Sequence, residues 1–387
     1  MVRRVENKFF VTCAKGIEEV LAGELNRLGI ENTEVSSAGV YFTGDWEDCY
    51  RANLWLRTAA RVVYEIGRFN FKNAEDLYNG AKAIAWSDYF RLNQTFAIFA
   101  NVSNSEFITH SGFAALKVKD AVADSFRASY GRRPNVDAGD PDIRIFIRIN
   151  GEECIVNLDT SGESLHKRGY RTEKGKAPMR ETLAAALVLM AGYDGSVDFY
   201  DFMCGSGTIP IEAALIATNR PPNMNRKLFG FQQLTSYNRR LWTKVRAAAE
   251  DKQLNSIKCK ITASDFSKRS IEIMKSNARR ADVREFIDIS VSEFKDTHKK
   301  HDSGMIIVNP PYGERLDRGG IEGLSALYEL LGDTLKQNYT GHDAYVISGN
   351  TELTKCIGLK TSEKSVVYNG PIECRLLKYE LYEGSAL

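Results

Sequence analysis

The first part of the chain alternates between helical and strand-like hydrophobic patterns. One helix is predicted by apolar positions that recur every three to four residues, namely Ile17, Val20, Leu21, Leu25 and Leu28, with Gly29 as a stop. Residues 9–11 and 35–42 on either side are typical of strands. A second helix from Trp46 leads into a β-rich stretch at 61–66. These patterns predict a small α+β unit that ends near residue 70.

A second mixed block follows. Helices are predicted at 74–85 and 112–130, and a strand at 95–102. Two further strands, 143–149 and 154–158, are joined through Asn150-Gly151, which is a strong signal for a β-hairpin. This block predicts a second compact α+β module.

The order of elements changes after residue 180, where helices and strands alternate regularly. Such alternation is typical of a doubly wound, mostly parallel sheet, so we expect an α/β fold for the C-terminal part. Three domains are therefore expected, at residues 1–70, 71–160 and 161–387.

Composition limits the class of protein. Of the 387 residues, 43% are hydrophobic and 26% charged, and no segment approaches the run of about 18 apolar residues that spans a membrane. The first residues lack the apolar stretch of a signal peptide, so a cytoplasmic protein is expected. Seven scattered cysteines without a Cys-x-x-Cys pair indicate reduced, mostly buried thiols and no metal site. A net charge of +2 is too small to indicate nucleic-acid binding, which would have to depend on local basic patches.

A glycine-containing turn suggests a cofactor site. The predicted strand 197–201 runs into Phe202-Met203-Cys204-Gly205-Ser206-Gly207-Thr208 and then a helix. Glycines let the backbone approach a ligand and leave amides free at the helix N-terminus, although an ordinary strand-to-helix turn is the alternative. The sequence lacks Gly-Lys-Ser/Thr and the third glycine of a dinucleotide site, which favours a cofactor without phosphates.

Two acidic residues end the next predicted strands. Asp265 follows strand 260–264, where a carboxylate can accept both hydroxyls of a ribose, or can simply cap a turn. Glu293 follows strand 286–291 and is a candidate acceptor for an adenine amino group. Asp296, three residues on, is its rival.

The fourth strand, 304–308, ends in Asn309-Pro310-Pro311-Tyr312. The prolines remove backbone donors and fix an extended turn whose carbonyls point outward. If Asn309 and the Pro310 carbonyl each accept one N–H of an exocyclic amine, its lone pair is aimed at an incoming methyl group, and Tyr312 stacks on the base. The alternative is a Pro-Pro turn that merely ends a strand.

A basic segment precedes the α/β part. Six cations and one acid occupy residues 165–180, and Tyr170 is interleaved among them. The segment is either a solvated linker or a phosphate-binding strip in which Lys167, Arg168 and Arg171 contact nucleic acid.

Taken together, these motifs resemble the THUMP-domain-containing RNA methyltransferases, in particular the bacterial 23S rRNA guanine-N2 methyltransferases often labelled N6-adenine-specific DNA methylases. The segments that carry the resemblance are 166–171, 177–184, 201–214, Asp265, 309–313 and 369–375. The resemblance implies a class I Rossmann-like methyltransferase domain, preceded by a ferredoxin-like subdomain at 1–70 and a THUMP RNA-binding domain at 71–160. Phe202 departs from the proline that the family usually has after the aspartate.

The resemblance also implies the roles of individual residues. S-adenosylmethionine is the expected cofactor, held by Asp201, Cys204, Gly205, Ser206, Gly207, Thr208, Asp265, Glu293, Arg180 and Thr182. Arg226 and Lys227, in an insertion at 220–227, together with Arg239 and Arg240, would grip RNA, or else belong to a solvated insertion.

The expected reaction is transfer of a methyl group to the N2 amine of a guanine in RNA, with 23S rRNA favoured and the base flipped into the pocket. Three alternatives stay open: N6-adenine methylation of DNA, guanine-N2 methylation of tRNA, and a non-catalytic RNA-binding assembly factor. The sequence leaves the modified nucleotide, the need for an assembly partner and the oligomeric state open.

Overall fold

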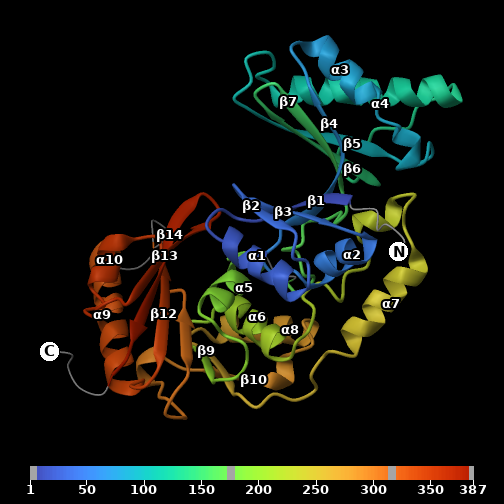
Figure 1. Ribbon diagram of the computed structural model, residues 1–387. Helices are drawn as coiled ribbons and strands as arrows, with labels where there is room; N and C mark the ends of the chain where they lie inside the picture. Colours follow the sequence, from blue (N-terminus) through green and yellow to red (C-terminus); the bar gives the residue numbers. More distant parts are fainter. Residues whose placement is uncertain (1–6, 172–178, 313–319, 383–387) are drawn as a thin grey trace. The chain divides into compact units, whose positions relative to one another are not determined.

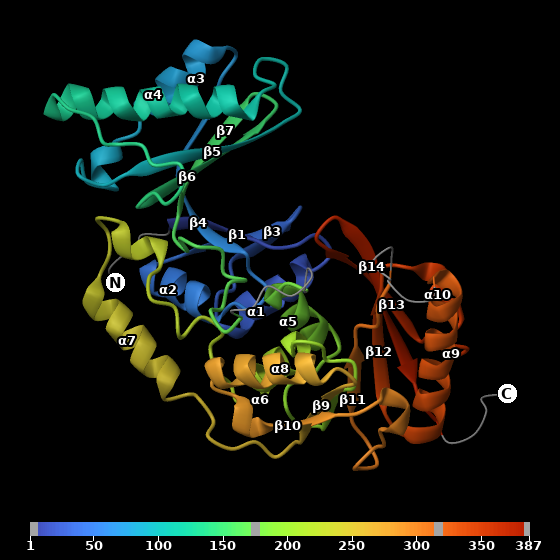
Figure 2. The same cartoon turned by 180° about the vertical axis from the view of Figure 1, so that it is seen from behind.

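The computed structural model describes residues 7–171, 179–312 and 320–382 (Figures 1 and 2). The chain forms two compact units that interleave along the sequence. The first contains the N-terminal strand, Ala22–Leu165 and Arg226–Ala247, and the second contains Ala14–Leu21, His166–Asn225 and the chain from Ala248 onward. Residues 226–247 therefore belong with the N-terminal unit, although they lie inside the C-terminal half of the sequence.

One seven-stranded sheet organises the first unit, in the order β2-β3-β1-β4-β7-β6-β5. The strands are β1 (Asn7–Thr12), β2 (Thr33–Ser36), β3 (Gly39–Gly44), β4 (Arg61–Asn70), β5 (Phe96–Ser103), β6 (Ile143–Asn150) and β7 (Glu153–Asp159). β5 and β6 are parallel and the other neighbours are antiparallel. Because β4 pairs with β7, the two predicted α+β modules share one continuous sheet.

The segment 35–42, predicted as one strand, is a hairpin instead. β2 and β3 pair antiparallel, with Val35 opposite Val40 and Ser36 opposite Gly39. Ala38 adopts a left-handed φ of 58°, which reverses the chain within a run of small residues. The prediction was wrong because the turn lacks the Asn-Gly or Asp-Gly signal and is flanked by strand-forming residues.

Helices cover one face of this sheet. They are α2 (Trp46–Trp55), α3 (Ala74–Lys82) and α4 (Ser111–Tyr130), with short turns η1 (Trp86–Asp88) and η2 (Gly230–Gln233). α1 (Glu18–Arg27) and α7 (Arg239–Glu250) each contain a boundary between the two units. α3 and α4 pack on the β5–β6–β7 half (Figure 2), where they bury the alternate isoleucines of β6.

The second unit is a mostly parallel seven-stranded sheet in the order β10-β9-β8-β11-β12-β14-β13. Its strands are β8 (Phe199–Asp201), β9 (Ile261–Asp265), β10 (Ile287–Val291), β11 (Met305–Val308), β12 (Asp343–Ser348), β13 (Glu363–Asn369) and β14 (Ile372–Glu380). The first five are parallel, and the β13–β14 hairpin is added antiparallel beside β12. The expected α/β fold with a doubly wound sheet is confirmed.

The helices of this unit are α5 (Glu181–Met190), α6 (Thr208–Ala217), α8 (Lys268–Arg280), α9 (Gly320–Asn338) and α10 (Thr351–Lys355), with turns η3 (Arg284–Phe286) and η4 (Phe294–Asp296). Tyr328, Leu331 and Leu335 of α9 belong to one buried cluster with residues of β11, β12 and β14, and α9 runs alongside β12 (Figure 1). The strand order reverses between β8 and β11, and ligands of open α/β sheets bind at the carboxyl ends of the strands at such a point.

Two expectations about composition bear on the fold. All seven cysteines are free thiols, and each is buried except Cys356, which is partly exposed. Among the described residues, no helix is long and apolar enough to cross a membrane.

Candidate active site

The predicted site residues converge at the carboxyl edge of three neighbouring strands. Asp201 of β8 pairs with Ala263 of β9, and Ile306 of β11 pairs with Tyr200. Asp265 lies two residues after Ala263 and Asn309 three residues after Ile306, so extending this register past Asp201 brings them level with each other on either side of the turn that follows β8. The glycine turn and the Asn-Pro-Pro-Tyr segment therefore share one edge of the sheet.

The two glycines of the turn serve different purposes. Gly205 has a φ of 53°, and a Cβ added there would meet no atom of the described residues within 4 Å, so the described part of the chain leaves its backbone open. Gly207 has a φ of 85°, and a Cβ there would lie 2.4 Å from Cγ of Met274. Gly205 leaves room for a ligand against the backbone, whereas Gly207 lets α6 begin close against α8.

Asp265 orients the turn. Its Oδ2 accepts the Gly205 N–H at 2.9 Å, and its Oδ1 accepts the Ser267 N–H at 2.9 Å. The carboxylate is therefore held by two backbone donors, in agreement with the turn-capping interpretation, while each oxygen keeps a further lone pair for a ligand hydroxyl. The two interpretations of this residue are compatible.

Asp201 is 2% exposed, and its Oδ1 accepts the Met203 N–H at 3.1 Å. Burial raises the pKa of Asp201 well above its usual range, and the neighbouring Asp265 adds to the shift. This carboxyl group shapes the start of the turn from inside the protein.

The remaining turn residues are fixed by backbone contacts. Cys204 donates its N–H to the Ser264 carbonyl at 3.0 Å, and burial raises the pKa of its thiol. The Ser206 carbonyl accepts the Asn277 amide of α8 at 3.0 Å. Thr208 is buried at the first position of α6. The turn is thus tied to both β9 and α8.

Asn309 carries the most informative side chain of the site. Within the part of the chain that is described, its buried Oδ1 has no hydrogen-bond partner. Leaving a buried acceptor unpaired costs about 1–3 kcal/mol, so such groups call for an explanation. Pro310 behind it is buried, and neither proline can supply an N–H. An acceptor is thereby kept available at the edge of the sheet.

Tyr312 is held in place by segments that the sequence did not single out for a role. Its hydroxyl accepts the Asn369 amide at 3.1 Å and lies 3.5 Å from the Cys374 thiol. Its ring lies against Gly349, where an added Cβ would come within 2.9 Å of the ring carbons. Burial raises the pKa of Tyr312, so the phenol stays protonated at neutral pH. Segment 369–375 was noticed as part of the resemblance, but contact with Tyr312 required the tertiary structure.

The sequence patterns did not single out Phe266, which directly follows Asp265. Its side chain is 72% exposed, the highest value among the exposed large hydrophobic residues. An aromatic residue next to a strand-terminal acid was the available signal. Such a ring offers a stacking surface beside the carboxylate.

The other predicted cofactor residues lie at element ends. Glu293 directly precedes η4 and Asp296 closes it, and both are exposed. Arg180 is exposed at the N-cap of α5, and Thr182 is buried in the first turn of that helix. Exposure alone does not decide between Glu293 and Asp296.

The basic segment divides into buried and exposed cations. The Arg168 side chain is 1% exposed and ion-pairs with Glu212, which is equally buried. The prediction that Arg168 contacts RNA is therefore wrong, because a buried guanidinium cannot reach a phosphate. Arg171 ion-pairs with Glu181 at 3.1 Å and donates to the Met179 carbonyl. Residues 172–178 of this segment lie outside the described residues.

In the insertion, Arg226 donates to the carbonyls of Ser164 at 3.1 Å and Glu163 at 2.7 Å. It holds a loop of its own unit, which differs from the RNA-gripping role expected for it. Lys167 and Lys227 are exposed, as phosphate contact requires.

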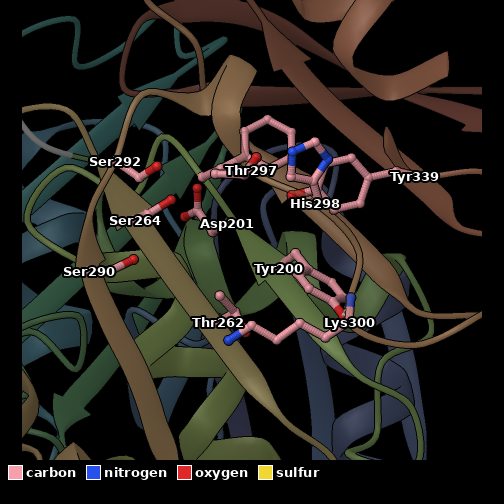
Figure 3. Close-up of a pocket in the computed structure, with 11 residues that line it drawn as sticks. Tyr200, Asp201, Thr262, Ser264, Ser290, Ser292, Thr297, His298, Lys300 and Tyr339 are labelled. Carbon is pink, nitrogen blue, oxygen red and sulfur yellow. Dashed lines mark hydrogen bonds between the residues drawn. The ribbon is translucent and has the colours of Figure 1, made fainter. Parts of the chain in front are cut away.

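A small polar pocket lies beside the turn (Figure 3). Its volume is about 180 Å³, and it is lined by Asp201, Ser264, Ser290, Ser292 and His298, among others. Sites for small molecules usually measure about 300–1,000 Å³, so this pocket is too small to be the whole cofactor site.

Comparisons with known proteins agree with this geometry. The RMKL-like methyltransferase domain matches residues 168–378, the RlmL ferredoxin-like domain matches 8–63, and the THUMP domain matches 71–159. The chain belongs to the THUMP-containing, RlmL-like RNA methyltransferase family. It is an S-adenosylmethionine-dependent enzyme of that family.

Individual relatives extend over the whole chain. A Synechocystis protein described provisionally as an RNA methyltransferase is 41% identical over 97% of both chains. The ribosomal RNA large subunit methyltransferase K/L of Photobacterium profundum is 38% identical over 98% of this chain and 54% of its own length. The chain thus spans about half the length of the K/L relatives.

Solved structures are similar throughout. SMU.472, described provisionally as a methyltransferase and complexed with SAH, superimposes with a TM-score of 0.89 at 30% identity, covering 98% of this chain and 99% of its own. A Listeria monocytogenes protein described as a predicted N6-adenine-specific DNA methylase has a TM-score of 0.88 at 33% identity, over 97% and 96%.

Proposed function

We propose that this enzyme methylates the exocyclic N2 amine of a guanine in RNA, with 23S rRNA as the favoured substrate. The observation that carries the proposal is the buried Oδ1 of Asn309, which has no hydrogen-bond partner among the described residues and lies at the edge of the sheet where the glycine turn lies. The names of the K/L relatives support ribosomal RNA as the acceptor.

The cofactor fits the turn because Gly205 leaves its backbone open to a ligand. In the proposed arrangement Asp265 accepts the ribose hydroxyls, Phe266 stacks on the adenine and Glu293 accepts its amino group. The peptide groups from Cys204 to Thr208 line the turn above Asp201, and Arg180 and Thr182 hold the methionine end. When bound, S-adenosylmethionine supplies an electrophilic methyl group on a sulfonium.

The acceptor amine is held by the fourth strand's end. The lone pair of an exocyclic amine is delocalised into its ring, which makes the nitrogen a weak nucleophile. Hydrogen bonds from its two N–H groups to Asn309 Oδ1 and the Pro310 carbonyl turn the lone pair out of the ring plane. The Tyr312 ring, fixed by Asn369 and Gly349, then stacks on the flipped base.

The rest of the chain is proposed to hold RNA. Residues 1–70 and 71–160 grip the substrate, and residues 161–387 carry the reaction. Lys167 and Lys227 are the exposed cations best suited to phosphates, whereas Arg168 and Arg226 stabilise the protein itself.

N6-adenine methylation of DNA remains the second candidate because Asn309 and Pro310 accept either amine, and one structural relative carries that description. The test uses purified enzyme with isotope-labelled S-adenosylmethionine and unmodified rRNA, tRNA or DNA. Mass spectrometry of the digested nucleosides should find labelled 2-methylguanosine from 23S rRNA. Label in N6-methyladenosine from DNA, or 2-methylguanosine from tRNA alone, would replace the proposed substrate, and no transfer with retained RNA binding would favour an assembly factor.

A further inference from the structure

The sheet of the first unit has one face that none of the described helices of that unit covers. Along β6 the isoleucines at 143, 145, 147 and 149 are buried under α3 and α4, so Arg144, Phe146 and Arg148 point to the opposite side. The register places Phe99 of β5 and Asn157 of β7 on either side of Phe146. The side chains of this face therefore line up across neighbouring strands.

This face contains a cavity of about 320 Å³ that extends from β3 to β5. We call it the aromatic groove, and its lining includes Phe10, Tyr41, Arg61, Phe99, Phe146, Arg148, Ile155 and Asn157. Val63 and Ile155 on its floor are buried, whereas Phe99 on its rim is 37% exposed. The volume lies at the lower end of the range of about 300–1,000 Å³ for small-ligand sites, which suits one or two nucleotides.

Aromatic rings and guanidinium groups alternate in the groove. The rings of Phe99 and Phe146 are stacked, with centroids 5.2 Å apart and planes inclined by 26°. The Arg61 guanidinium lies 5.2 Å from the centroid of Phe146. On the other side, Arg148 donates to the Tyr41 hydroxyl at 2.9 Å. Flat π surfaces and cations next to each other are the features on which unpaired bases and their phosphates bind.

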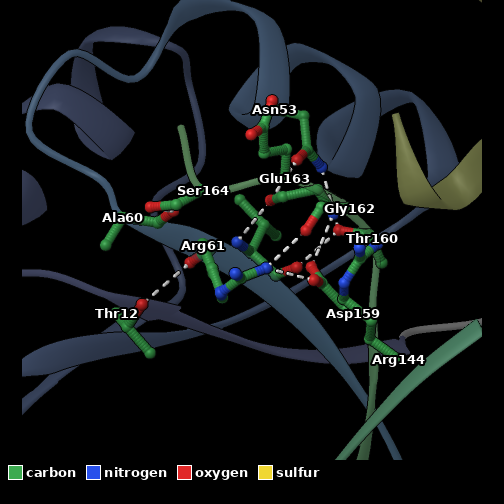
Figure 4. Close-up of polar contacts among 12 residues, drawn as sticks. Thr12, Asn53, Ala60, Arg61, Arg144, Asp159, Thr160, Gly162, Glu163 and Ser164 are labelled. Carbon is green, nitrogen blue, oxygen red and sulfur yellow. Dashed lines mark hydrogen bonds and ion pairs between the residues drawn. The ribbon is translucent and has the colours of Figure 1, made fainter. Parts of the chain in front are cut away.

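The positive charges of the groove are unequally compensated. Arg61 is fixed by the buried carboxylate of Asp159 and by the Gly162 carbonyl, as Figure 4 shows. Arg144 lies on the same face but outside the lining of the groove, where it ion-pairs with the exposed carboxylate of Asp140 and also interacts electrostatically with Asp159. Arg148 forms no ion pair with any residue that the structure describes, because its partner is a neutral phenol. The groove therefore has a net attraction for an anion.

We propose that the aromatic groove binds unpaired RNA nucleotides, with one base stacked on Phe99 and Phe146 and a phosphate at Arg148. This inference rests on the proposed function in taking RNA as the substrate. A double helix does not fit, because its bases are already stacked on each other and are not open to an aromatic surface. The groove would recognise a loop, bulge or single-stranded end near the modified guanine.

The test compares the full-length enzyme with Phe99→Ala and Phe146→Leu in binding a fluorescent eight-nucleotide single-stranded RNA and a fully paired, blunt-ended duplex RNA. Phe146→Leu keeps an apolar side chain but removes the π surface. Each change should weaken single-strand binding about tenfold, as expected for the loss of one stacked base, and should leave duplex binding within about twofold. Phe146→Tyr should bind like the wild type.

Phe113→Ala is the matched control. Phe113 is an exposed phenylalanine of the same unit, on α4, with the Lys117 ammonium 5.7 Å from its ring centroid. Unchanged single-strand binding by Phe99→Ala and Phe146→Leu would overturn the proposal. Equal loss of single-strand binding by Phe113→Ala would do the same. If the groove variants bound RNA like the wild type but lost binding of an apolar peptide, the groove would be a peptide site and the proposal would also fail.

Folding and function are separated by two further measurements. Phe99→Ala removes a partly exposed ring, so its thermal midpoint should stay close to that of the wild type even if the half-buried Phe146 tolerates change less well. S-adenosylhomocysteine affinity should be unchanged in every variant. If the wild type methylates rRNA and the groove variants bind single-stranded RNA normally, only the groove proposal fails. If the wild type does not methylate rRNA but the groove variants bind single-stranded RNA more weakly, only the proposed substrate fails.

Discussion

At the residue scale, Asn309 and Asp265 satisfy their polar atoms in opposite ways. Both carboxylate oxygens of Asp265 accept backbone N–H groups, so this residue builds the turn even before a ligand binds. The Asn309 oxygen is buried without a partner among the described residues, so its desolvation is not offset within the protein. Such an uncompensated group is expected where an acceptor is reserved for a substrate.

Asn309→Ala should therefore separate activity from stability. Methyl transfer should fall by about two orders of magnitude, the usual effect of removing one hydrogen-bonding group aimed at the reacting centre. Calorimetric affinity for S-adenosylhomocysteine should stay within about twofold, and the free energy of unfolding should be unchanged or slightly higher because an unpaired buried oxygen has gone. A large loss of stability or of cofactor affinity would contradict the assigned role.

Gly207→Ala tests the second glycine of the turn. Gly192→Ala is a matched control, because Gly192 has a similar φ of 78° but an added Cβ there would meet no atom of the described part of the chain within 4 Å. The control should lose about 1–2 kcal/mol from left-handed backbone strain alone. Gly207→Ala should lose more in urea denaturation because its Cβ also collides with Met274. Equal losses would show that close packing at Gly207 is unimportant.

At the element scale, the segment 166–171 is anchored to α6 by a buried polar cluster. Arg168 pairs with Glu212 of α6, and the Tyr170 hydroxyl donates to the same carboxylate at 3.1 Å. The Asn223 side chain accepts from the Arg168 guanidinium at 3.4 Å. These contacts position the start of the methyltransferase unit relative to the helix that follows the cofactor turn.

Arg168→Ala and Lys167→Ala should consequently have different effects. Removing Arg168 leaves the Glu212 charge buried without its ion-pair partner and should cost about 3–5 kcal/mol in chemical denaturation. Lys167→Ala should change stability by less than about 0.5 kcal/mol. The Lys167 variant should weaken RNA binding and lower the slope of log affinity against log salt by about 0.7–0.9, as expected for one lost phosphate contact. An unchanged slope would return Lys167 to the role of a solvated surface residue.

At the scale of the whole molecule, stability is coupled to pH through His166. Burial lowers the pKa of His166 to about 4, and Arg180, Lys167, Arg168 and Arg171 shift it in the same direction. The folded protein thus binds fewer protons than the unfolded chain between pH 6.5 and 4. The contribution of His166 to stability is complete above pH 6.5 and is lost as the pH falls toward 4.

His166→Gln should remove this dependence. Between pH 7 and pH 5 the wild type should lose roughly 1 kcal/mol more unfolding free energy than the variant, a value already reduced because the imidazole is only half-buried. Urea denaturation at the two pH values measures the difference. Parallel pH profiles for the two proteins would rule out a proton-linked role for His166.

Much of the architecture followed from local pattern. The α/β alternation after residue 180 and the hairpin at Asn150-Gly151 depend on hydrophobic period and turn chemistry, which neighbouring residues specify. Candidate positions of Asp265, Gly205 and Asn309 came from where strands end. Their assigned roles remain predictions. The three residues share one edge of the sheet because each lies at or just after the carboxyl end of a parallel strand.

Long-range contacts decided what the sequence left open. A cation in 165–180 is buried only where folding brings a buried carboxylate next to it. The carboxylate that pairs with Arg168 lies 44 positions away, on α6. The single sheet across both N-terminal modules depends on the pairing of β4 with β7, which no local signal records. The sequence determined most of the elements and the residue types at their ends, because both depend on neighbours in the chain. Only the tertiary structure decided which charges are buried, which face of a sheet is open and what holds Tyr312, because these depend on residues brought together by folding.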